Sequence, residues 1–234
     1  MKIRIKFRKY GTMKFIGHLD MMRYFQKAIR RAGIDICYSE GFSPHMIMSF
    51  ASPLGVGLTS DGEYLDIEVG QELSSASAVE RLNRAGTEGV EVLSFRKIPD
   101  GKTSNAMALV AAADYQVRFR ENCRPETGWQ EHFAAFLRQP SISVIKQTKK
   151  NQRELDIRPL IYEAQCREDH IFLKLAAGSA DNLKPELLME AFGAYAGITF
   201  PEFAFFIHRC ELYADLGTEK EHRFVSLEDL GEDF

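Results

Sequence analysis

Apolar and polar side chains alternate at the start of the chain and then recur at helical spacing. Ile3, Ile5 and Phe7 share one face of a strand that the alternation predicts over residues 2–8. Apolar residues three and four positions apart then predict a helix over residues 18–32. The residues expected to face the core from this helix are Leu19, Met22, Phe25, Ile29 and Ala32.

The rest of the chain continues as two successive sets of elements. The first half is predicted to contain strands over residues 2–8, 46–51, 63–69 and 89–95 and helices over residues 18–32 and 74–85. The second half is predicted to contain strands over residues 106–120, 141–147, 154–166, 170–176 and 203–213 and helices over residues 125–138 and 185–196.

The order strand–helix–strand–strand–helix–strand in the first half recurs less clearly in the second. It predicts an α+β fold of tandem ferredoxin-like (βαββαβ) units, each an antiparallel sheet with helices on one face. The predicted units span residues 1–97 and 105–216, and residues 217–234 are expected to form an acidic C-terminal tail.

Composition indicates an ordinary globular protein of the cytoplasm. The 234 residues are 45% apolar and 27% charged. The four cysteines, scattered without metal-binding spacing, favour free thiols in a reducing compartment. No apolar run reaches the length of about 18 residues that a membrane helix needs, so we expect a cytoplasmic protein without membrane contact.

The net charge of −3 conceals an asymmetry between the two ends of the chain. Residues 1–33 contain ten Lys and Arg and a single Asp, whereas the segment from Asp215 to the end contains seven Asp and Glu and two basic residues. Such asymmetry is typical of an N-terminal surface that faces a polyanion or an acidic partner. The alternative is a solvated helix face and a solvated acidic tail.

A basic surface is the first candidate for function. Four basic residues recur on the helix face opposite its apolar residues: Arg23, Lys27, Arg30 and Arg31. Arg4, Lys6 and Arg8, on the outer face of the first strand, are expected to lie beside them. With Tyr10 and Tyr24 nearby, such a surface would suit single-stranded RNA.

Two further polar segments have ordinary alternatives. Asp66 and Glu68 share one strand face and are either paired carboxylates or partners of Arg4 and Lys6 in ion pairs. The turn Thr148–Arg153 is either a second small basic patch or a solvated hairpin turn.

Two histidines and an aspartate form the second candidate. His18 and Asp20 flank the start of the helix, and His45 follows Pro44 in an irregular loop. If the loop runs back along the helix, they would converge as a metal site, an acid–base pair or a phosphate clamp. Otherwise His18 caps its helix and His45 anchors the loop. Two histidines are too few for a catalytic metal, so we expect none. The candidate binding residues of the loop are Ser39, Glu40, Phe42 and Ser43.

Three motifs occur in order along the first third of the chain. They are GHLDMMRYFQKAIRRAG, YSEGFSPH and SFASPLGVGLTSDGEYLDIEV. Together they resemble the radical-SAM-linked domain of unknown function DUF2344. The chain departs from the family's usual wording at Gly17, at Ser43 and at Met46–Ile47, where Ser, Asn and Pro followed by Lys or Arg are common. Because Ile47 stands where Lys or Arg is common, the loop lacks that basic residue, and this argues against phosphate binding by the loop itself.

The resemblance implies a partnership with a radical S-adenosylmethionine enzyme, because family members are fused to or encoded beside such enzymes. This chain lacks the closely spaced cysteines that an iron–sulfur cluster requires. We therefore expect no cofactor on this chain, and the cluster and S-adenosylmethionine on a partner.

The implied function is that of an accessory or substrate-recognition protein. The resemblance also implies a substrate, because genes of family members occur near genes for ribonuclease G and ribosomal proteins. RNA or the ribosome is therefore the expected substrate. The alternative is a stand-alone RNA-processing or RNA-modifying enzyme that uses His18, Asp20 and His45.

Overall fold

The computed structural model of the chain divides into two compact units. It describes residues 1–71, 73–101, 104–147, 152–179, 181–218 and 221–234. Unit 1 comprises residues 1–112 and 209–234, and unit 2 comprises residues 113–208. The C-terminal segment therefore belongs with the N-terminal part of the chain, which differs from the sequential boundaries expected from the sequence. No helix in the described ranges is both long and apolar enough to cross a bilayer.

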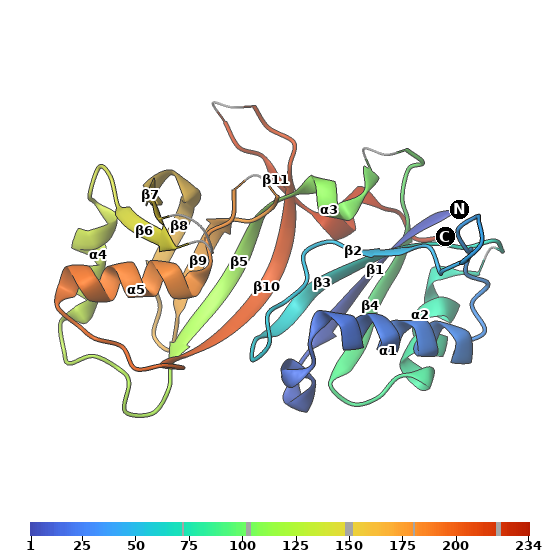
Figure 1. Cartoon of the computed structure of the whole chain (residues 1–234), viewed down its shortest axis with the longest axis horizontal. Helices are drawn as coiled ribbons and strands as arrows, with labels where there is room; N and C mark the ends of the chain where they lie inside the picture. Colours follow the sequence, from blue (N-terminus) through green and yellow to red (C-terminus); the bar gives the residue numbers. More distant parts are fainter. Residues whose placement is uncertain (72, 102–103, 148–151, 180, 219–220) are drawn as a thin grey trace. The chain divides into compact units, whose positions relative to one another are not determined.

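Unit 1 is an antiparallel sheet with two helices on one face (Figure 1). Its elements are β1 (Lys2–Lys9), η1 (Gly11–Phe15), α1 (His18–Arg31), β2 (Met48–Phe50), β3 (Thr59–Glu68), α2 (Ser75–Ala85), β4 (Val90–Lys97), α3 (Ala106–Leu109), β11 (Phe224–Ser226) and η4 (Leu227–Leu230). The strand order is β4-β1-β3, with β2 antiparallel to β3. Strands β5 (Val110–Phe119) and β10 (Phe205–Asp215) have residues in both units.

The apolar alternation of β1 determines which face of the sheet the helices cover. Ile3, Ile5 and Phe7 are buried in one cluster with residues of α1 and α2. The rings of Phe7 and Phe25 lie 4.7 Å apart in an edge-on contact. The predicted inward face of β1 is confirmed.

The opposite face of β1 carries basic residues, and acidic neighbours pair with them. Arg4 binds Asp66 through two nitrogens, at 2.8 Å and 2.9 Å. Lys6 donates to Glu211 and to Glu228, at 2.7 Å in each case. Because side chains alternate across a strand, these residues lie on the face away from α1. The expectation of a combined basic surface with α1 is therefore wrong for Arg4 and Lys6, whereas the alternative of an Arg4–Asp66 ion pair is confirmed.

The described part of the predicted tail packs against unit 1, with Leu227 on this second face and Phe234 against the helix-side core. β11 pairs with β10, and Leu227 is fully buried. The backbone N–H of Phe234 donates to the Ser75 hydroxyl at 3.1 Å. Arg96 forms ion pairs with three acids of the segment: Glu228, Asp229 and Asp233. Some of the positive charge near the N-terminus is therefore neutralised by acidic residues of the C-terminal segment, as in the Lys6–Glu228 pair.

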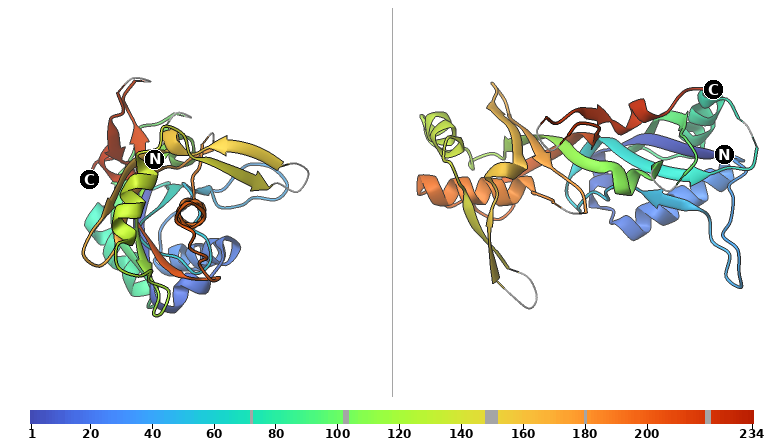
Figure 2. Two further views of the ribbon diagram at one scale, coloured as in Figure 1. Left: turned by 90° about the vertical axis from the view of Figure 1, so that its left-hand side faces the viewer. Right: turned by 90° about the horizontal axis from the view of Figure 1, so that it is seen from above.

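Unit 2 contains a run of neighbouring β-strands and a strongly aromatic core. Its further elements are α4 (Trp129–Leu137), β6 (Ser143–Gln147), β7 (Gln152–Asp156), η3 (Arg158–Leu160), β8 (Ile161–Cys166), β9 (Ile171–Ala176) and α5 (Pro185–Ala196). The strand order is β10-β5-β9-β8, and β6 and β7 form a separate hairpin that projects from the unit (Figure 2). Phe133 and Phe192 are fully buried and meet edge-on at 5.0 Å.

Three local predictions differ from the structure. Leu19 is 62% exposed, because it lies about 140° around the helix from the centre of the buried face at roughly 100° per residue. Met21 takes the core position instead. The predicted strand 106–120 begins as α3, which Asn105 caps by accepting from the N–H of Met107. The predicted strand 154–166 is interrupted at Pro159 by η3.

Candidate functional site

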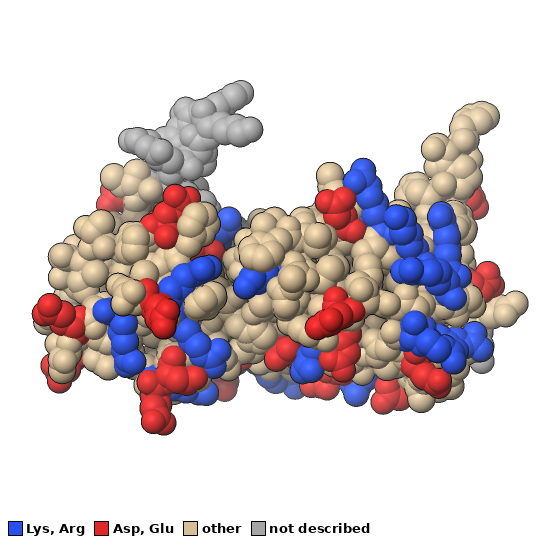
Figure 3. Space-filling model, turned by 90° about the horizontal axis from the view of Figure 1, so that it is seen from below, with Lys and Arg blue, Asp and Glu red and all other residues tan. Residues whose placement is uncertain are grey.

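Helix α1 presents a basic face that is accessible to solvent. Arg23, Lys27, Arg30 and Arg31 are all exposed, opposite the buried residues of the helix. Arg23 forms an ion pair with Asp20 at 2.9 Å. Among the described residues, Lys27, Arg30 and Arg31 have no ion-pair partner. Figure 3 shows Lys and Arg side chains gathered over this part of unit 1.

The charges of α1 suit the electrostatics of a helix. Asp20 lies in the first turn and Arg30 and Arg31 in the last, so each sign complements the nearer end of the helix dipole. Gly17 precedes the helix in an extended conformation without a capping side chain. The last turn, where Asp20 is absent, is therefore the most positive part of the face.

A closed loop projects from unit 1 next to the end of α1 (Figure 2). We call residues 39–45 the Ser39–His45 loop. Tyr38 and Met46 form an isolated antiparallel bridge at its base. The Ser39 hydroxyl lies 2.8 Å from His45 Nδ1 and accepts from the His45 N–H at 3.1 Å. Contacts between Ser39 and His45 thus close the loop at its base.

Phe42 stands at the exposed end of the Ser39–His45 loop. Its side chain is fully exposed, although Phe is among the residues that folded proteins bury most often. Gly41 has a φ of 107°, a conformation that L side chains rarely adopt and that glycine adopts without strain. Glu40 and Ser43 belong to the same loop, and Glu40 is also exposed. The loop therefore presents an aromatic side chain that is not packed into the hydrophobic core of the protein.

His18 lies at the other end of α1. Its ring contacts Phe50 edge-on at 5.2 Å and lines a small hollow with Lys9 and Glu63. The base of the loop is held near Glu68, whose carbonyl accepts from the N–H of Cys37 at 2.8 Å. Glu63 lies beside His18 and Glu68 lies beside the base of the loop. The two glutamates are five positions apart on β3, which separates the two ends of this region by about 17 Å.

The structure therefore does not bring His18 and His45 together. His18 and Asp20 lie in the first turn of α1, whereas the Ser39–His45 loop lies next to its other end, about 20 Å away along a helix of 14 residues (Figure 1). The loop extends outward and does not fold back along the helix. In the described part of the chain no group of His, Cys, Asp and Glu is arranged to hold a metal ion. Residues 148–151 of the turn Thr148–Arg153 lie outside the described residues.

Buried charges beside His18 are the part of this region that the sequence analysis missed. Lys9, Glu63 and Arg209 are each 2–4% exposed. Arg209 Nε donates to Glu63 Oε1 at 3.0 Å, and Lys9 Nζ donates to the carbonyl of Ile16 at 2.7 Å. Burial lowers the pKa of Lys9, Glu63 opposes this shift, and Arg209 adds to it.

The alternation of apolar and polar residues in β1 and β3 could have identified Lys9 and Glu63 as inward-facing charges. Lys9 follows Ile3, Ile5 and Phe7 at the next inward position of β1, and Glu63 precedes two inward apolar residues of β3. A charged residue at an inward position must be paired inside the protein, which makes it a candidate for structure or chemistry.

Comparisons with known proteins place these features in one family. The model of a family described as an uncharacterized protein conserved in bacteria (DUF2344) matches residues 2–185. The match includes α1, the Ser39–His45 loop and most of unit 2. The comparison with curated proteins finds no match.

Proposed function

The chain belongs to the DUF2344 family of uncharacterized bacterial proteins, and on this premise we propose that it recognises a substrate for a radical S-adenosylmethionine enzyme. RNA or a ribosomal particle is the proposed substrate. The observation that carries the proposal is the exposed basic face of α1, on which Lys27, Arg30 and Arg31 have no ion-pair partner among the described residues, beside the projecting Ser39–His45 loop. The link to radical S-adenosylmethionine enzymes rests on the resemblance of the three motifs to that family.

The basic face of α1 is the proposed contact for RNA phosphates. Lys27, Arg30 and Arg31 have no ion-pair partner among the described residues, so a phosphate would not have to displace an acid. Arg23 would have to leave Asp20 first. Phosphate contacts of this kind release counterions and give a binding constant that falls steeply with salt.

The Ser39–His45 loop is the proposed contact for the partner enzyme. An exposed aromatic side chain on a closed loop loses little conformational freedom on binding, and aromatic residues dominate the binding energy of many interfaces. Phe42 is the proposed anchor, and Tyr38 at the base of the loop is also exposed.

The iron–sulfur cluster and S-adenosylmethionine would be bound by the partner. The four cysteines of this chain are not in disulfides and, within the described ranges, do not form a group of the kind that ligates a cluster: Cys37, Cys123, Cys166 and Cys210. Reduced thiols also support the proposal of a cytoplasmic location.

We further propose that both units are ferredoxin-like. In unit 1 the elements β1-α1-β2-β3-α2-β4, the strand order β4-β1-β3 and the β2–β3 pairing support this. In unit 2 the elements β5-α4-β8-β9-α5-β10 and the order β10-β5-β9-β8 support it, with β6 and β7 as an insertion. An experimental structure with β1 or β5 at a sheet edge would contradict the proposal.

The partner is tested by site-specific photo-crosslinking in living cells. A photoreactive phenylalanine analogue replaces Phe42, and a matched variant carries the same analogue at Phe15, which is also exposed but lies in η1. We expect a radical S-adenosylmethionine enzyme to be crosslinked from position 42 and not from position 15. Equal yields at both positions, or no such enzyme at position 42, would refute the assignment of the loop.

The RNA contact is tested by charge reversal. The variant with Arg23, Lys27, Arg30 and Arg31 changed to Glu is expected to lose RNA binding and to keep its unfolding midpoint, because these side chains face solvent. The matched control changes four other exposed basic residues to Glu: Arg84, Lys97, Arg138 and Lys184. Retained RNA affinity in the folded α1 variant would remove the basic face from the mechanism.

An intrinsic RNA-processing activity is the second candidate. The observation in its favour is that exposed His18 and buried Lys9, whose pKa burial lowers, line the same hollow, although Asp20 and His45 do not join it. RNA cleavage or modification by the purified protein, lost in His18→Ala and kept in His45→Ala, would establish this function in place of the first.

A further inference from the structure

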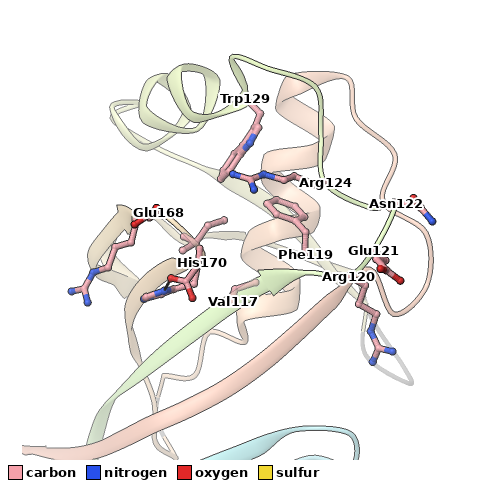
Figure 4. A pocket seen from close by; sticks show the side chains of 12 residues that line it. Val117, Phe119, Arg120, Glu121, Asn122, Arg124, Trp129, Glu168 and His170 are labelled. Carbon is pink, nitrogen blue, oxygen red and sulfur yellow. Dashed lines mark hydrogen bonds and ion pairs between the residues drawn. The ribbon is translucent and has the colours of Figure 1, made fainter.

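Unit 2 contains a pocket that none of the predicted site residues lines (Figure 4). Its volume is about 270 Å³, close to the lower end of the range for small-molecule sites. The pocket lies where β5 ends, where α4 begins and beside the turn before β9. Six of its residues matter here: Phe119, Arg124, Trp129, Arg167, Asp169 and His170.

His170 contributes a ring nitrogen that the protein leaves unused. Its side chain is 10% exposed, and its Nδ1 lies 2.6 Å from the Asp169 carboxylate. Among the described residues, His170 Nε2 is buried and has no hydrogen-bond partner. A buried polar atom without a partner costs free energy, and a ligand that fills its hydrogen bond recovers that cost.

Asp169 fixes the orientation of this imidazole. It also binds Arg118 at 3.0 Å, and the hydrogen bonds from His170 and Arg118 lower its pKa, so it remains a carboxylate at neutral pH. A carboxylate accepts a hydrogen bond from Nδ1–H. Nε2 is then an acceptor in the neutral ring and a donor in the protonated ring.

The other side of the pocket combines a guanidinium group with aromatic rings. Figure 4 shows Arg124 beside Trp129 and Phe119, whereas Arg120 turns away. Arg120 lies over the ring of Phe206, 4.2 Å from its centre. Arg124 is exposed and, within the described ranges, has no hydrogen bond or ion pair. Its charge is therefore available to a ligand.

We propose that this pocket binds a nucleoside monophosphate. The base packs against Phe119 and Trp129, and the phosphate accepts hydrogen bonds from Arg124 and from Nε2 of the protonated His170 ring. Arg167 also lines the pocket, with its guanidinium group 4.6 Å from the centre of the Phe172 ring. Guanidinium groups match phosphate geometry and aromatic rings stack on any base. Glu121 and Glu168 also line the pocket, and their charge disfavours the more anionic diphosphates and triphosphates. The nucleotide is either free or a residue of an RNA strand.

The only tryptophan of the chain lies in the wall of this pocket, so its fluorescence reports binding directly. The whole protein is titrated with AMP, GMP, CMP and UMP, with free tryptophan as the control for absorbed light. We expect a saturable change with at least one of them. Adenosine and inorganic phosphate should each bind about tenfold or more weakly, because each supplies only half of the contacts.

Two substitutions test the residues assigned to the phosphate. Arg124→Ala removes an exposed side chain that has no partner in the described ranges, and it should weaken binding about tenfold or more with an unchanged unfolding midpoint. His170→Asn retains a donor for Asp169, lacks Nε2 and should weaken binding similarly. Arg138→Ala, just after α4 and outside the pocket, is the control and should bind as the wild type does.

Competition identifies the source of the nucleotide. A short RNA that displaces the monophosphate indicates a residue of a strand, and one that does not indicates a free nucleotide. The variant with four reversed charges on α1 should keep the monophosphate signal, which separates this pocket from the proposed RNA surface. No saturable change with any of the four monophosphates, or wild-type affinity in both Arg124→Ala and His170→Asn, would overturn the assignment.

Discussion

Arg209 on β10 and Glu63 on β3 form a buried ion pair in unit 1. Arg209 Nε donates to Glu63 Oε1 at 3.0 Å, and the two side chains are 4% and 5% exposed. Arg209 Nη2 also donates to the carbonyl of Ser52. The pair ties the last long strand of the chain to the N-terminal sheet, although 146 positions separate the two residues.

Removing one member of this pair should destabilise the protein strongly. Glu63→Ala leaves the Arg209 charge buried without its partner, and we expect a loss of about 3–5 kcal/mol in the free energy of unfolding. Urea denaturation measures the loss. Glu91→Ala breaks the half-exposed pair with Arg8 and should cost about 1 kcal/mol or less. Similar losses in both variants would contradict the distinction between buried and exposed pairs.

The C-terminal segment should act as part of the core of unit 1. Leu227 is fully buried, so Leu227→Ala is expected to cost about 2–5 kcal/mol. Leu216→Ala is the matched control, because Leu216 is 42% exposed and its truncation leaves no cavity. Calorimetric unfolding compares the two. An unchanged midpoint for Leu227→Ala would mean that residues 224–234 are a dispensable tail.

The Lys6–Glu228 ion pair should make stability depend on pH in the acidic range. Burial acts to raise the pKa of Glu228, but hydrogen bonds from Lys6 and Ser94 outweigh it, and the pKa lies below its usual value. A carboxyl with a lowered folded-state pKa adds stability above its unfolded pKa of about 4.3 and loses it as pH falls through the folded value.

Glu228→Gln removes this titration. The free energy of unfolding of the variant should therefore be lower at neutral pH and should fall less steeply than that of the wild type as pH decreases below about 5. Urea denaturation at a series of pH values measures both slopes. Glu80→Gln on the exposed face of α2 should leave the slope unchanged. Parallel slopes for Glu228→Gln and the wild type would refute the linkage.

Single substitutions on α1 should change the salt dependence of RNA binding by different amounts. Lys27→Ala and Arg30→Ala each remove one phosphate contact and should reduce the logarithmic salt slope by about 0.7. Arg23→Ala should reduce it less, because Asp20 already neutralises Arg23 at 2.9 Å. Filter binding over a range of salt concentrations provides the slopes, with Arg84→Ala on α2 as the control. Equal slopes for all four variants would exclude α1 as the phosphate contact.

Features that depend on neighbours along the chain were predictable from the amino-acid sequence. The spacing of apolar residues predicts a helix over residues 18–32, and the structure has it over His18–Arg31 with its four basic residues exposed. The alternation of β1 likewise predicts its buried face. Both follow because the helical and strand periods fix which side chains share a face.

Parts of the candidate sites could not be predicted from the spacing of residues along the chain. The helix face was predictable, but the direction of the Ser39–His45 loop was not, because a Gly- and Pro-containing loop has no period that fixes its path. His170 stood alone in the sequence, and only the turn before β9 brings it to the same pocket as Arg124 and Trp129. Lys9 and Glu63 were visible as charges at inward positions, but their common neighbour Arg209 was not.

Which charges are neutralised and which remain available depends on contacts between distant parts of the chain. Lys6 and Glu228 are 222 positions apart, and a basic residue on a strand looks the same in sequence whether solvent or an acid faces it. The strand and helix periods assign a side chain to a face but contain no information about what covers that face. The N-terminal positive charge was therefore readable from the sequence, whereas its division between the paired β1 and the open face of α1 required the fold.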